Sequence, residues 1–569
     1  MLTKLICRNF KNFGEVEIEL GNPVVFIGPN NSGKTTALQA LALWEIALRR
    51  WNENRKGKTN PEKRPGVAIN RLDLISVPVP EARLLWRDLQ VRNVERVEGR
   101  QRTQNVRIDI IVEGVTDGKD WQCGFEFDYA NQESFYCRPM RTSEVNGKAS
   151  DRMPVPEEAG NLSVALLPPM SGLTANEPRL DPGAINVRIG EGRTAEVLRN
   201  LCHQASQDPK TWKILCEQIA ELFGVKLDKP DYIPGRGEIR MSYREESNVS
   251  LDISSSGRGL QQTLLLLVYI AAHPRSVLLL DEPDAHLEIL RQRQIYQVLT
   301  ELAREHGSQI IAASHSEVIL NEAAGRDVVI AFLGMPHRID DRGSQLLKSL
   351  RTIGFEHYYQ ARQQGWVLYL EGPTDLVILQ AFAEKLGHGA REVLKAPYFH
   401  YVGNQPTEAR KHFYGLREAK PDLVGFCLLD HIDSELHRGT RLKEYAWKRR
   451  EIENYIVSNK QVLIDWGHAE MALFSKSLEE QITKFENALA TLTLGKESPW
   501  SPNIKVTDDF LDPLFATFFQ DIGLPNLMEK TNYHTLVQYL SLKQIDPEVT
   551  DVLDMILEVA NKAVSLSSV

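Results

Sequence analysis

The sequence predicts an α/β protein, and three observations lead to this prediction. A glycine-rich turn at residues 28–35 joins a short apolar segment to one with helical spacing. Two later apolar segments, 276–280 and 309–314, each end in polar or acidic side chains. Residues 366–429 repeat apolar segments of strand length with helical segments between them. Alternation of strand and helix patterns is typical of α/β folds.

The composition describes an ordinary soluble chain of 569 residues, long enough for two to four domains. No apolar run approaches the roughly 18 residues of a membrane span, and Met1-Leu2-Thr3-Lys4 lacks the pattern of a signal peptide. Six scattered cysteines without a C-x-x-C pair favour reduced thiols in a cytoplasmic protein over zinc ligands or disulfides. The net charge of −9 means that nucleic-acid contacts must come from local basic patches.

Residues 28–35 fit the phosphate-binding motif G-x-x-x-x-G-K-[ST] without a mismatch. Gly28 and Gly33 permit a tight turn whose N–H groups surround phosphate oxygens at the positive end of the following helix. Lys34 is expected to reach the β- and γ-phosphates, and the Thr35 hydroxyl to take one Mg²⁺ position. We therefore expect ATP and Mg²⁺ here, against the alternative of a glycine-rich turn with a chance Lys-Thr. The other expected nucleotide contacts are Asn30, Asn31 and Thr36.

Residues 1–20 predict two strands around a turn at 12–14, since apolar residues alternate with glutamates in the second half. The stretch from Ile6 to Phe13 resembles the opening of RecF/SMC-type ATP-binding-cassette (ABC) ATPases, "I-x-N-F-[RK]-x-[FY]", with one extra residue before Asn9. Residues 106–130 alternate apolar and polar side chains, which predicts antiparallel strands in a β-rich flank of the ATPase.

Residues 49–71 form a basic stretch in which glycines and prolines break any long helix. Its cations are Arg49, Arg50, Arg55, Lys56, Lys58, Lys63, Arg64 and Arg71. An exposed basic loop is suited to contact DNA phosphates. A loop that is merely solvated explains the same composition, so both interpretations stay open.

Residues 254–262, Ser-Ser-Ser-Gly-Arg-Gly-Leu-Gln-Gln, precede an apolar helix and resemble the ABC signature in its RecF/OLD-like form. In that family, small residues at a helix N-terminus grip the γ-phosphate bound to a second subunit, through free N–H groups and the helix dipole. The resemblance implies a homodimer or a higher even-numbered oligomer that pairs through the ATPase heads. The corresponding residues are Ser255, Ser256, Gly257 and Gly259.

The strand predicted at 276–280 ends in Asp281 and Glu282, the Walker B pattern. Asp281 is expected to hold Mg²⁺ through water, and Glu282 to orient or deprotonate the attacking water. Residues 284–286 stand where ABC enzymes have the D-loop, and His315 matches the switch histidine that senses the γ-phosphate. A lone histidine after a strand is usually structural, but the order of the motifs favours the functional role. No Q-loop glutamine can be assigned. The resemblance implies an ABC-type ATPase domain over 1–345.

A second α/β module follows. Strands predicted at 366–370, 398–402 and 423–429 form a small parallel sheet, and Glu371 and Asp430 follow the first and third strands. Functional residues of such sheets lie at the carboxyl ends of the strands.

This module resembles a TOPRIM domain, the fold of topoisomerases, primases and OLD-family nucleases, over 360–460. Glu371 matches the first motif and Asp375 an OLD-like extra position, while Asp430-x-x-Asp433 replaces the usual Asp-x-Asp. Glu453 lies in Glu451-Ile452-Glu453-Asn454-Tyr455, which resembles the segment after the TOPRIM core in ATPase–nuclease fusions. Each acid alone is more often a solvated surface residue. Together, such carboxylates need cations, so we expect Mg²⁺ or Mn²⁺.

Residues 461–569 have mainly helical patterns and are expected to complete the nuclease half. Lys530 resembles a lysine that OLD-type nucleases hold beside the scissile phosphate, although a surface lysine is the simpler interpretation. The whole chain resembles an OLD-family ATP-dependent nuclease, which implies cleavage of DNA, or alternatively RNA, and a role with a partner protein in bacterial defence against phage. The alternatives are a DNA repair or clamping ATPase with a docking TOPRIM fold, and a toxin-regulating ATPase.

Overall fold

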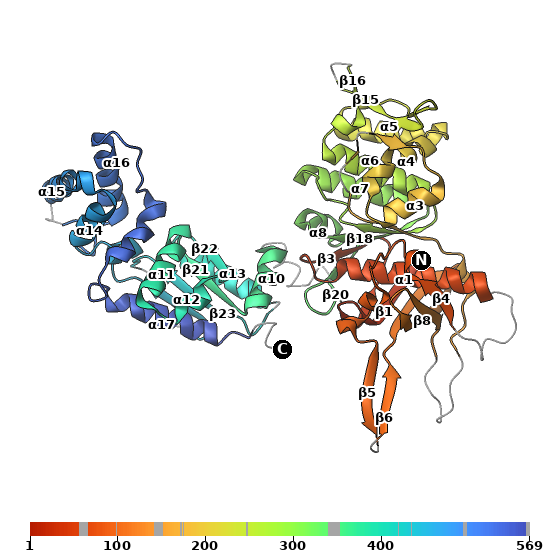
Figure 1. The fold of residues 1–569 in the computed structure, drawn as a ribbon, viewed down its shortest axis with the longest axis horizontal. Coiled ribbons are helices and arrows are strands. Elements are labelled where there is room, and N and C mark those ends of the chain that lie inside the picture. Colours follow the sequence, from red (N-terminus) through yellow and green to blue (C-terminus); the bar gives the residue numbers. More distant parts are fainter. Residues whose placement is uncertain are drawn as a thin grey trace. The chain divides into compact units, whose positions relative to one another are not determined.

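The computed structural model describes residues 1–55, 66–97, 100–141, 152–170, 173–174, 176–245, 249–339, 353–418, 420–433, 435–437, 439–492 and 498–564. The chain divides into two compact units, Met1–Arg351 and Thr352–Val569 (Figure 1). Among the described helices, none combines the length and the apolar character needed to cross a membrane.

The central sheet of the N-terminal unit has the strand order β10-β17-β18-β3-β19-β20. Neighbouring strands are parallel except at the β19–β20 edge. The bounds are β3 (Val24–Ile27), β10 (Val164–Leu167), β17 (Val277–Asp281), β18 (Gln309–Ser314), β19 (Val328–Ala331) and β20 (His337–Arg338). This confirms the strand predicted before the P-loop (β3) and the two predicted at 276–280 and 309–314 (β17 and β18). All three are mainly apolar segments that are buried on both faces.

A second, antiparallel sheet with the order β2-β1-β7-β8-β9-β4 forms the predicted β-rich flank. Its strands are β1 (Leu2–Phe10), β2 (Phe13–Glu19), β4 (Val67–Asn70), β7 (Ile108–Thr116), β8 (Lys119–Asn131) and β9 (Ser134–Pro139). A separate hairpin, β5 (Arg92–Val97) and β6 (Arg100–Asn105), projects from this flank in Figure 1. The P-loop helix α1 (Lys34–Arg55) packs into one core with both sheets.

Helices cover the other face of the central sheet. They are α4 (Leu198–Ala205), α5 (Pro209–Phe223), α6 (Arg258–Ala272) and α7 (Ile289–Glu305), which gather on one side of the unit in Figure 1. Because side chains alternate along a strand, Leu279 of β17 packs in the core of α1, whereas Leu278 and Leu280 pack in the core of α6. The P-loop helix and α6 therefore lie on opposite faces of the same sheet.

Shorter elements complete the N-terminal unit: α2 (Glu157–Gly160), α3 (Pro182–Gly190), α8 (Glu317–Ala323), β11 (Glu177–Pro178), β12 (Lys226–Leu227), β13 (Asp231–Ile233), β14 (Glu238–Arg240), β15 (Ser242–Arg244) and β16 (Ser250–Asp252).

The C-terminal unit is built on a parallel sheet with the order β22-β21-β23-β24, as predicted for its first three strands. The bounds are β21 (Trp366–Leu370), β22 (Phe399–Tyr401), β23 (Val424–Leu429) and β24 (Leu442–Ala446). Leu368 and Leu370 pack against α11 (Pro373–Leu386) and its neighbours. The alternate residue Tyr369 faces α13 (Pro406–Arg417), beside which lies α10 (Phe355–Gln364).

The C-terminal segment packs in the same core as the sheet. Its helices are α14 (Gln461–Glu470), α15 (Ser475–Leu492), α16 (Asp512–Asp521) and α17 (Pro547–Asn561). Earlier in the unit, the short helix α12 spans Ala390–Leu394. Buried residues of α14, α16 and α17 belong to one hydrophobic cluster with those of β21, β23 and α11. The segment thus shares its core with the sheet.

Candidate functional site

The P-loop of the N-terminal unit is shaped by its glycines and by Lys34. Gly33 has φ +104°, and a Cβ there would lie 2.7 Å from the Phe13 ring, so only glycine fits. The Lys34 side chain is buried, and its Nζ donates to the carbonyl oxygens of Gly28 and Pro29, each at 2.7 Å. Lys34 thereby closes the loop around the position where the motif binds phosphate.

The Mg²⁺ position expected at Thr35 and Asp281 has suitable chemistry. The Thr35 hydroxyl lies 2.9 Å from Oδ2 of Asp281, which ends β17. Burial raises the pKa of Asp281 to about 6, so its charge needs a cation at neutral pH. The buried Ser32 Oγ has no hydrogen-bond partner among the described residues. A carboxylate, two hydroxyls and a lysine fit Mg²⁺ and ATP. Asn30 and Asn31 are exposed beside them and Thr36 is partly buried.

Glu282 and His315 meet next to this position. The Glu282 backbone has φ +49° and its N–H donates to the Ala313 carbonyl, which turns the chain sharply after β17. Oε1 of Glu282 lies 3.6 Å from Nδ1 of His315, and this contact raises the pKa of His315. Burial lowers the pKa of Lys34, while the carboxylates of Glu282, Asp281 and Asp284 oppose that effect. The P-loop, the Walker B acids and the predicted switch histidine therefore share one site.

The signature-like residues lie at the start of α6. Gly257 is the N-cap residue, Ser255 and Gly257 are exposed, and Ser256 donates its hydroxyl to the Ile253 carbonyl. With Gly259, residues 256–258 line a pocket of about 430 Å³ that also includes His286 and Arg291. No P-loop residue lines this pocket. The described chain does not bring these residues to its own phosphate-binding loop.

Four acidic side chains meet at the carboxyl end of the C-terminal sheet. Glu371 follows β21, Asp430 follows β23, and Asp375 lies in the first turn of α11. Asp375 Oδ2 accepts from the backbone N–H groups of Glu371 (2.9 Å) and Gly372 (3.2 Å). Burial, a side-chain hydrogen bond with Glu371 and repulsion from Glu371, Asp375 and Glu453 raise the pKa of Asp430 well above its usual range.

Glu453 supplies the clearest indication that this cluster is incomplete without cations. It is 2% exposed, and its Oε1 has no hydrogen-bond partner within the described part of the chain. Burial and then repulsion from Glu451 raise its pKa to about 8. A buried carboxylate oxygen without a partner is costly. Hard divalent cations such as Mg²⁺ and Mn²⁺, which prefer oxygen ligands, fit this set of donors.

Lys530 lies close enough to three glutamates of this region to interact with them electrostatically. Burial acts to lower its pKa, but Glu453, Glu451 and Glu371 together raise it. Two further groups were missed by the sequence analysis. Glu451 is buried and accepts from the Thr507 N–H at 2.6 Å, and the Lys505 ammonium interacts with Glu451 and Glu371. The sequence pattern Glu-x-Glu-Asn-Tyr at 451–455 could have indicated Glu451 as a member of this cluster, whereas no sequence pattern indicates Lys505.

Asp433 is not brought into this cluster. Its side chain is fully exposed, and its described ion-pair partner is His431, at 3.8 Å. The expectation that Asp433 is a metal ligand therefore finds no support in its described contacts.

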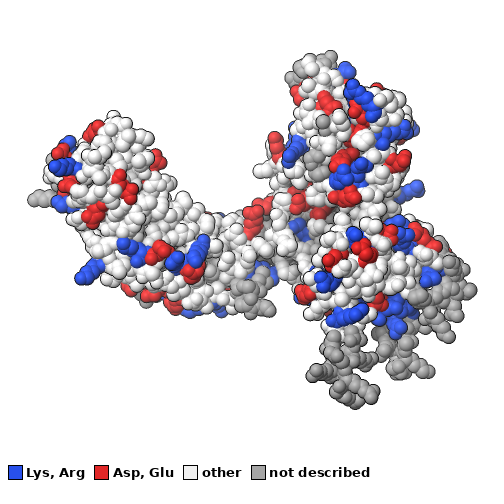
Figure 2. Space-filling model, in the orientation of Figure 1, with Lys and Arg blue, Asp and Glu red and all other residues white. Residues whose placement is uncertain are grey.

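The basic stretch offers less than its composition suggested, because residues 56–65 lie outside the described part of the chain. Of its flanking cations, Arg50 pairs with Asp73 at 2.5 Å and Arg71 with Glu133 at 2.6 Å. On the face drawn in Figure 2, basic and acidic side chains of the described residues are interspersed.

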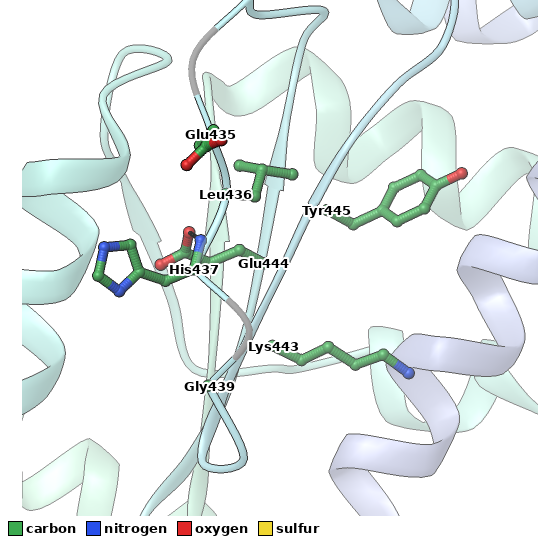
Figure 3. Close-up of a pocket in the computed structure, with 7 residues that line it drawn as sticks. All are labelled: Glu435, Leu436, His437, Gly439, Lys443, Glu444 and Tyr445. Atoms are coloured by element: carbon green, nitrogen blue, oxygen red, sulfur yellow. Dashed lines mark hydrogen bonds between the residues drawn. The ribbon is translucent and has the colours of Figure 1, made fainter.

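A pocket of about 1,100 Å³ lies beside β24, with Glu435, His437, Lys443 and Glu444 in its wall (Figure 3). Arg410 binds both Glu444 oxygens at 2.7 Å, and Lys443 pairs with Glu558 at 3.0 Å. Neighbours in the same unit therefore neutralise the charges of Lys443 and Glu444.

Two segments of the chain match models of ATPase families. Residues 1–63 match the "AAA ATPase domain" family, and residues 226–321 match the family described as "AAA domain, putative AbiEii toxin, Type IV TA system". The first segment contains the P-loop, and the second contains the signature-like residues, the Walker B acids and His315. No match was found among curated proteins.

Solved structures of SMC heads are among the matches. The SMC head bound to the C-terminal winged-helix domain of ScpA has 14% identity and a TM-score of 0.34, over 60% of this chain and 98% of that one. The Thermotoga maritima SMC head has 13% identity and a TM-score of 0.31, over 58% and 94%. The Pyrococcus furiosus SMC head bound to the ScpA C-terminal domain has 13% identity and a TM-score of 0.34, over 59% of this chain and 95% of that one. The two segments of the N-terminal unit that carry these motifs, residues 1–63 and 226–321, are therefore similar to ATPase domains.

Proposed function

We propose that the chain is an ATP-hydrolysing, metal-dependent nuclease that cleaves DNA strands at the acidic cluster of its C-terminal unit. One observation carries this proposal: the carboxylates of Glu371, Asp375 and Glu453 all act on Asp430, and Glu453 is buried with an unpartnered oxygen and with Lys530 near it. The resemblance to a TOPRIM domain of the OLD family supports the same interpretation.

Each group has a distinct task in this proposal. Mg²⁺ or Mn²⁺ held by Glu371, Asp430 and Glu453 would neutralise their charges and polarise a phosphate oxygen. Asp375 positions the turn after β21 through its two backbone hydrogen bonds. Lys530 offers a cation to the phosphate that is cut. Asp433 is left out of the ligand set because its side chain is fully exposed.

In the ATPase, Lys34 binds the phosphates, Asp281 and Thr35 hold Mg²⁺, and Glu282 activates water. His315, in contact with Glu282, senses whether a γ-phosphate is present. The exposed N-terminus of α6 supplies Ser256 and Gly257 to the nucleotide of a second copy, which makes the active form a homodimer or an assembly of dimers. Glu282→Gln with ATP should therefore dimerise in light scattering. A monomer under these conditions contradicts the composite site.

The nuclease is tested on supercoiled plasmid with Mg²⁺ or Mn²⁺, with and without ATP. Wild type should nick the plasmid only with metal, and Glu371→Ala and Asp430→Ala should abolish cleavage while hydrolysing ATP at the wild-type rate. Asp433→Ala is the matched control, since it removes a neighbouring exposed carboxylate, and should cleave normally. If Glu371→Ala and Asp430→Ala both cleave like wild type, the acidic cluster is not the nuclease site and the TOPRIM-like unit is a docking fold.

A second candidate is suggested by the family matched by residues 226–321, whose description names a toxin of a type IV toxin–antitoxin system. An RNA-directed or toxin-regulating ATPase should cleave tRNA, or hold a partner protein, without nicking plasmid. The proposed role in defence against phage, with a partner protein, is tested by plaque counts on bacteria expressing wild type or Glu371→Ala. Equal plaque counts would remove that role.

A further inference from the structure

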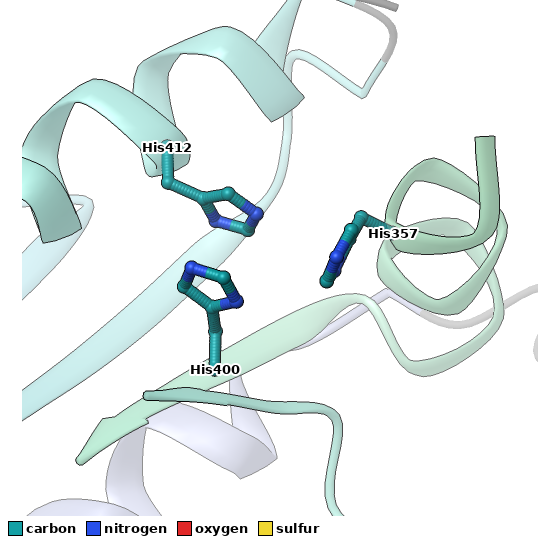
Figure 4. A group of neighbouring side chains, drawn as sticks. All are labelled: His357, His400 and His412. Carbon is teal, nitrogen blue, oxygen red and sulfur yellow. The ribbon is translucent and has the colours of Figure 1, made fainter. Parts of the chain in front are cut away.

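Three histidines converge on the α10/α13 face of the C-terminal sheet, and none belongs to the acidic cluster. His357 comes from α10, His400 from β22 and His412 from α13 (Figure 4). One ring nitrogen of each lies within 4.8 Å of one from both others. The rings of His400 and His412 are stacked 3.9 Å apart, and that of His357 stands perpendicular to both, at 5.2 and 5.1 Å.

Two tyrosines orient the imidazoles. The Tyr369 hydroxyl lies 2.9 Å from Nδ1 of His412, and the Tyr398 hydroxyl lies 3.0 Å from Nδ1 of His357. Histidines that bind metals commonly donate a hydrogen bond from the nitrogen that is not coordinated, which fixes the tautomer and the ring. In the tautomer whose Nδ1–H donates to the hydroxyl, the lone pair of each of these rings lies on Nε2.

The remaining nitrogen of His412 lacks a partner. Its Nε2 is buried and makes no hydrogen bond to any described residue. Burial and the two neighbouring imidazoles lower the pKa of His412 to about 3, and burial also lowers that of His400. Neutral imidazole is the form that binds metals. Simple ring packing leaves unexplained why a buried nitrogen of this three-histidine cluster has no hydrogen-bond partner.

We propose that His357, His400 and His412 bind one transition-metal ion of the zinc class. Three imidazoles without a carboxylate favour Zn²⁺, or its neighbours Co²⁺ and Ni²⁺, over the Mg²⁺ or Mn²⁺ suited to the acidic cluster. Three protein ligands leave a fourth position for water. The ion fastens α10 to β22 and α13. This site does not depend on the proposed nuclease function.

The test uses the full chain, stripped with EDTA and titrated with Zn²⁺ in excess Mg²⁺, which occupies the acidic cluster. Calorimetry should give one Zn²⁺ per chain, and Co²⁺ in its place should give the visible absorption of a four-coordinate ion. His357→Gln, His400→Gln and His412→Gln should each weaken binding about 100-fold or more, and Tyr369→Phe about 10-fold. His468→Gln is the matched control, because His468 is half-exposed on α14 beside Glu479.

Melting curves show whether the variants are folded. Zn²⁺ should raise the melting temperature of wild type and of the control His468→Gln, but not that of His357→Gln, His400→Gln or His412→Gln. Glu371→Ala should keep its zinc. Wild type that binds no Zn²⁺ in excess Mg²⁺, or glutamine variants that bind like wild type, would overturn the proposal. Loss of zinc in Glu371→Ala would also overturn it, because the ion would then lie in the acidic cluster.

Discussion

Asp281→Asn should stabilise the N-terminal unit in the absence of nucleotide, although it removes a residue of the ATPase site. Asp281 is 8% exposed, and burial raises its pKa from the usual 3.8 to about 6. A tenfold change in proton affinity corresponds to about 1.4 kcal/mol, so ionised Asp281 destabilises the fold by at most about 3 kcal/mol at pH 8. Asparagine keeps an acceptor for the Thr35 hydroxyl and carries no charge.

The sign of the pH dependence is set by the raised pKa. Folding disfavours the carboxylate, so the penalty is absent below pH 3.8, grows as the pH rises to about 6 and is complete above it. The advantage of Asp281→Asn should therefore be full at pH 8 and about half as large at pH 5. Mg²⁺ with ATP should stabilise wild type strongly and the variant much less, because the variant lacks the charge that holds the cation.

Scanning calorimetry of the full chain measures the effect. An unfolding entropy of about 2.1 cal/mol/K per residue, over the 351 residues of the unit, converts 3 kcal/mol into a rise of about 4 °C. The matched control is Asp327→Asn, since Asp327 is buried in the same unit but accepts from Tyr296 at 2.8 Å and pairs with Arg326. Losing that ion pair should lower the melting temperature.

The reasoning is refuted if Asp281→Asn melts below wild type at pH 8, or if its advantage is as large at pH 5 as at pH 8. Equal stabilisation of both proteins by Mg²⁺ and ATP would show that Asp281 does not hold the metal.

Three further predictions concern single side chains. Lys34→Ala should lose ATP binding in equilibrium dialysis, because the phosphates lose their buried cation; retained affinity contradicts the P-loop assignment. Glu282→Gln should bind ATP but hydrolyse it about 10²- to 10⁴-fold more slowly, and wild-type turnover in a phosphate-release assay contradicts the Walker B assignment. Glu548→Ala should destabilise the C-terminal unit by about 2–4 kcal/mol in urea, since Glu548 accepts from the Tyr445 and Tyr455 hydroxyls; unchanged stability would mean that water replaces it.

The ATPase half was largely predictable because its signals are local. The P-loop largely determines its own geometry. Lys34 donates a hydrogen bond to Gly28 within the motif, and Gly33 lies against Phe13 of the nearby strand β2. The parallel strands could be predicted as uninterrupted apolar runs, and their polar tips therefore indicated where Glu282 and His315 would meet. The signature-like residues, in contrast, line a pocket that contains no P-loop residue, so the role proposed for them requires a second copy.

The sequence by itself determined the two strand-end acids Glu371 and Asp430, because the ends of neighbouring parallel strands must lie together. Only the tertiary structure decided which other groups join them. Glu451 and Lys505 enter the cluster, whereas Asp433 turns to solvent, since loop paths depend on packing that no local pattern encodes. The three histidines show the same limit most clearly. They come from a helix, a strand and another helix with irregular spacing, and only the packing of α10 and α13 on one face of the sheet brings their nitrogens together.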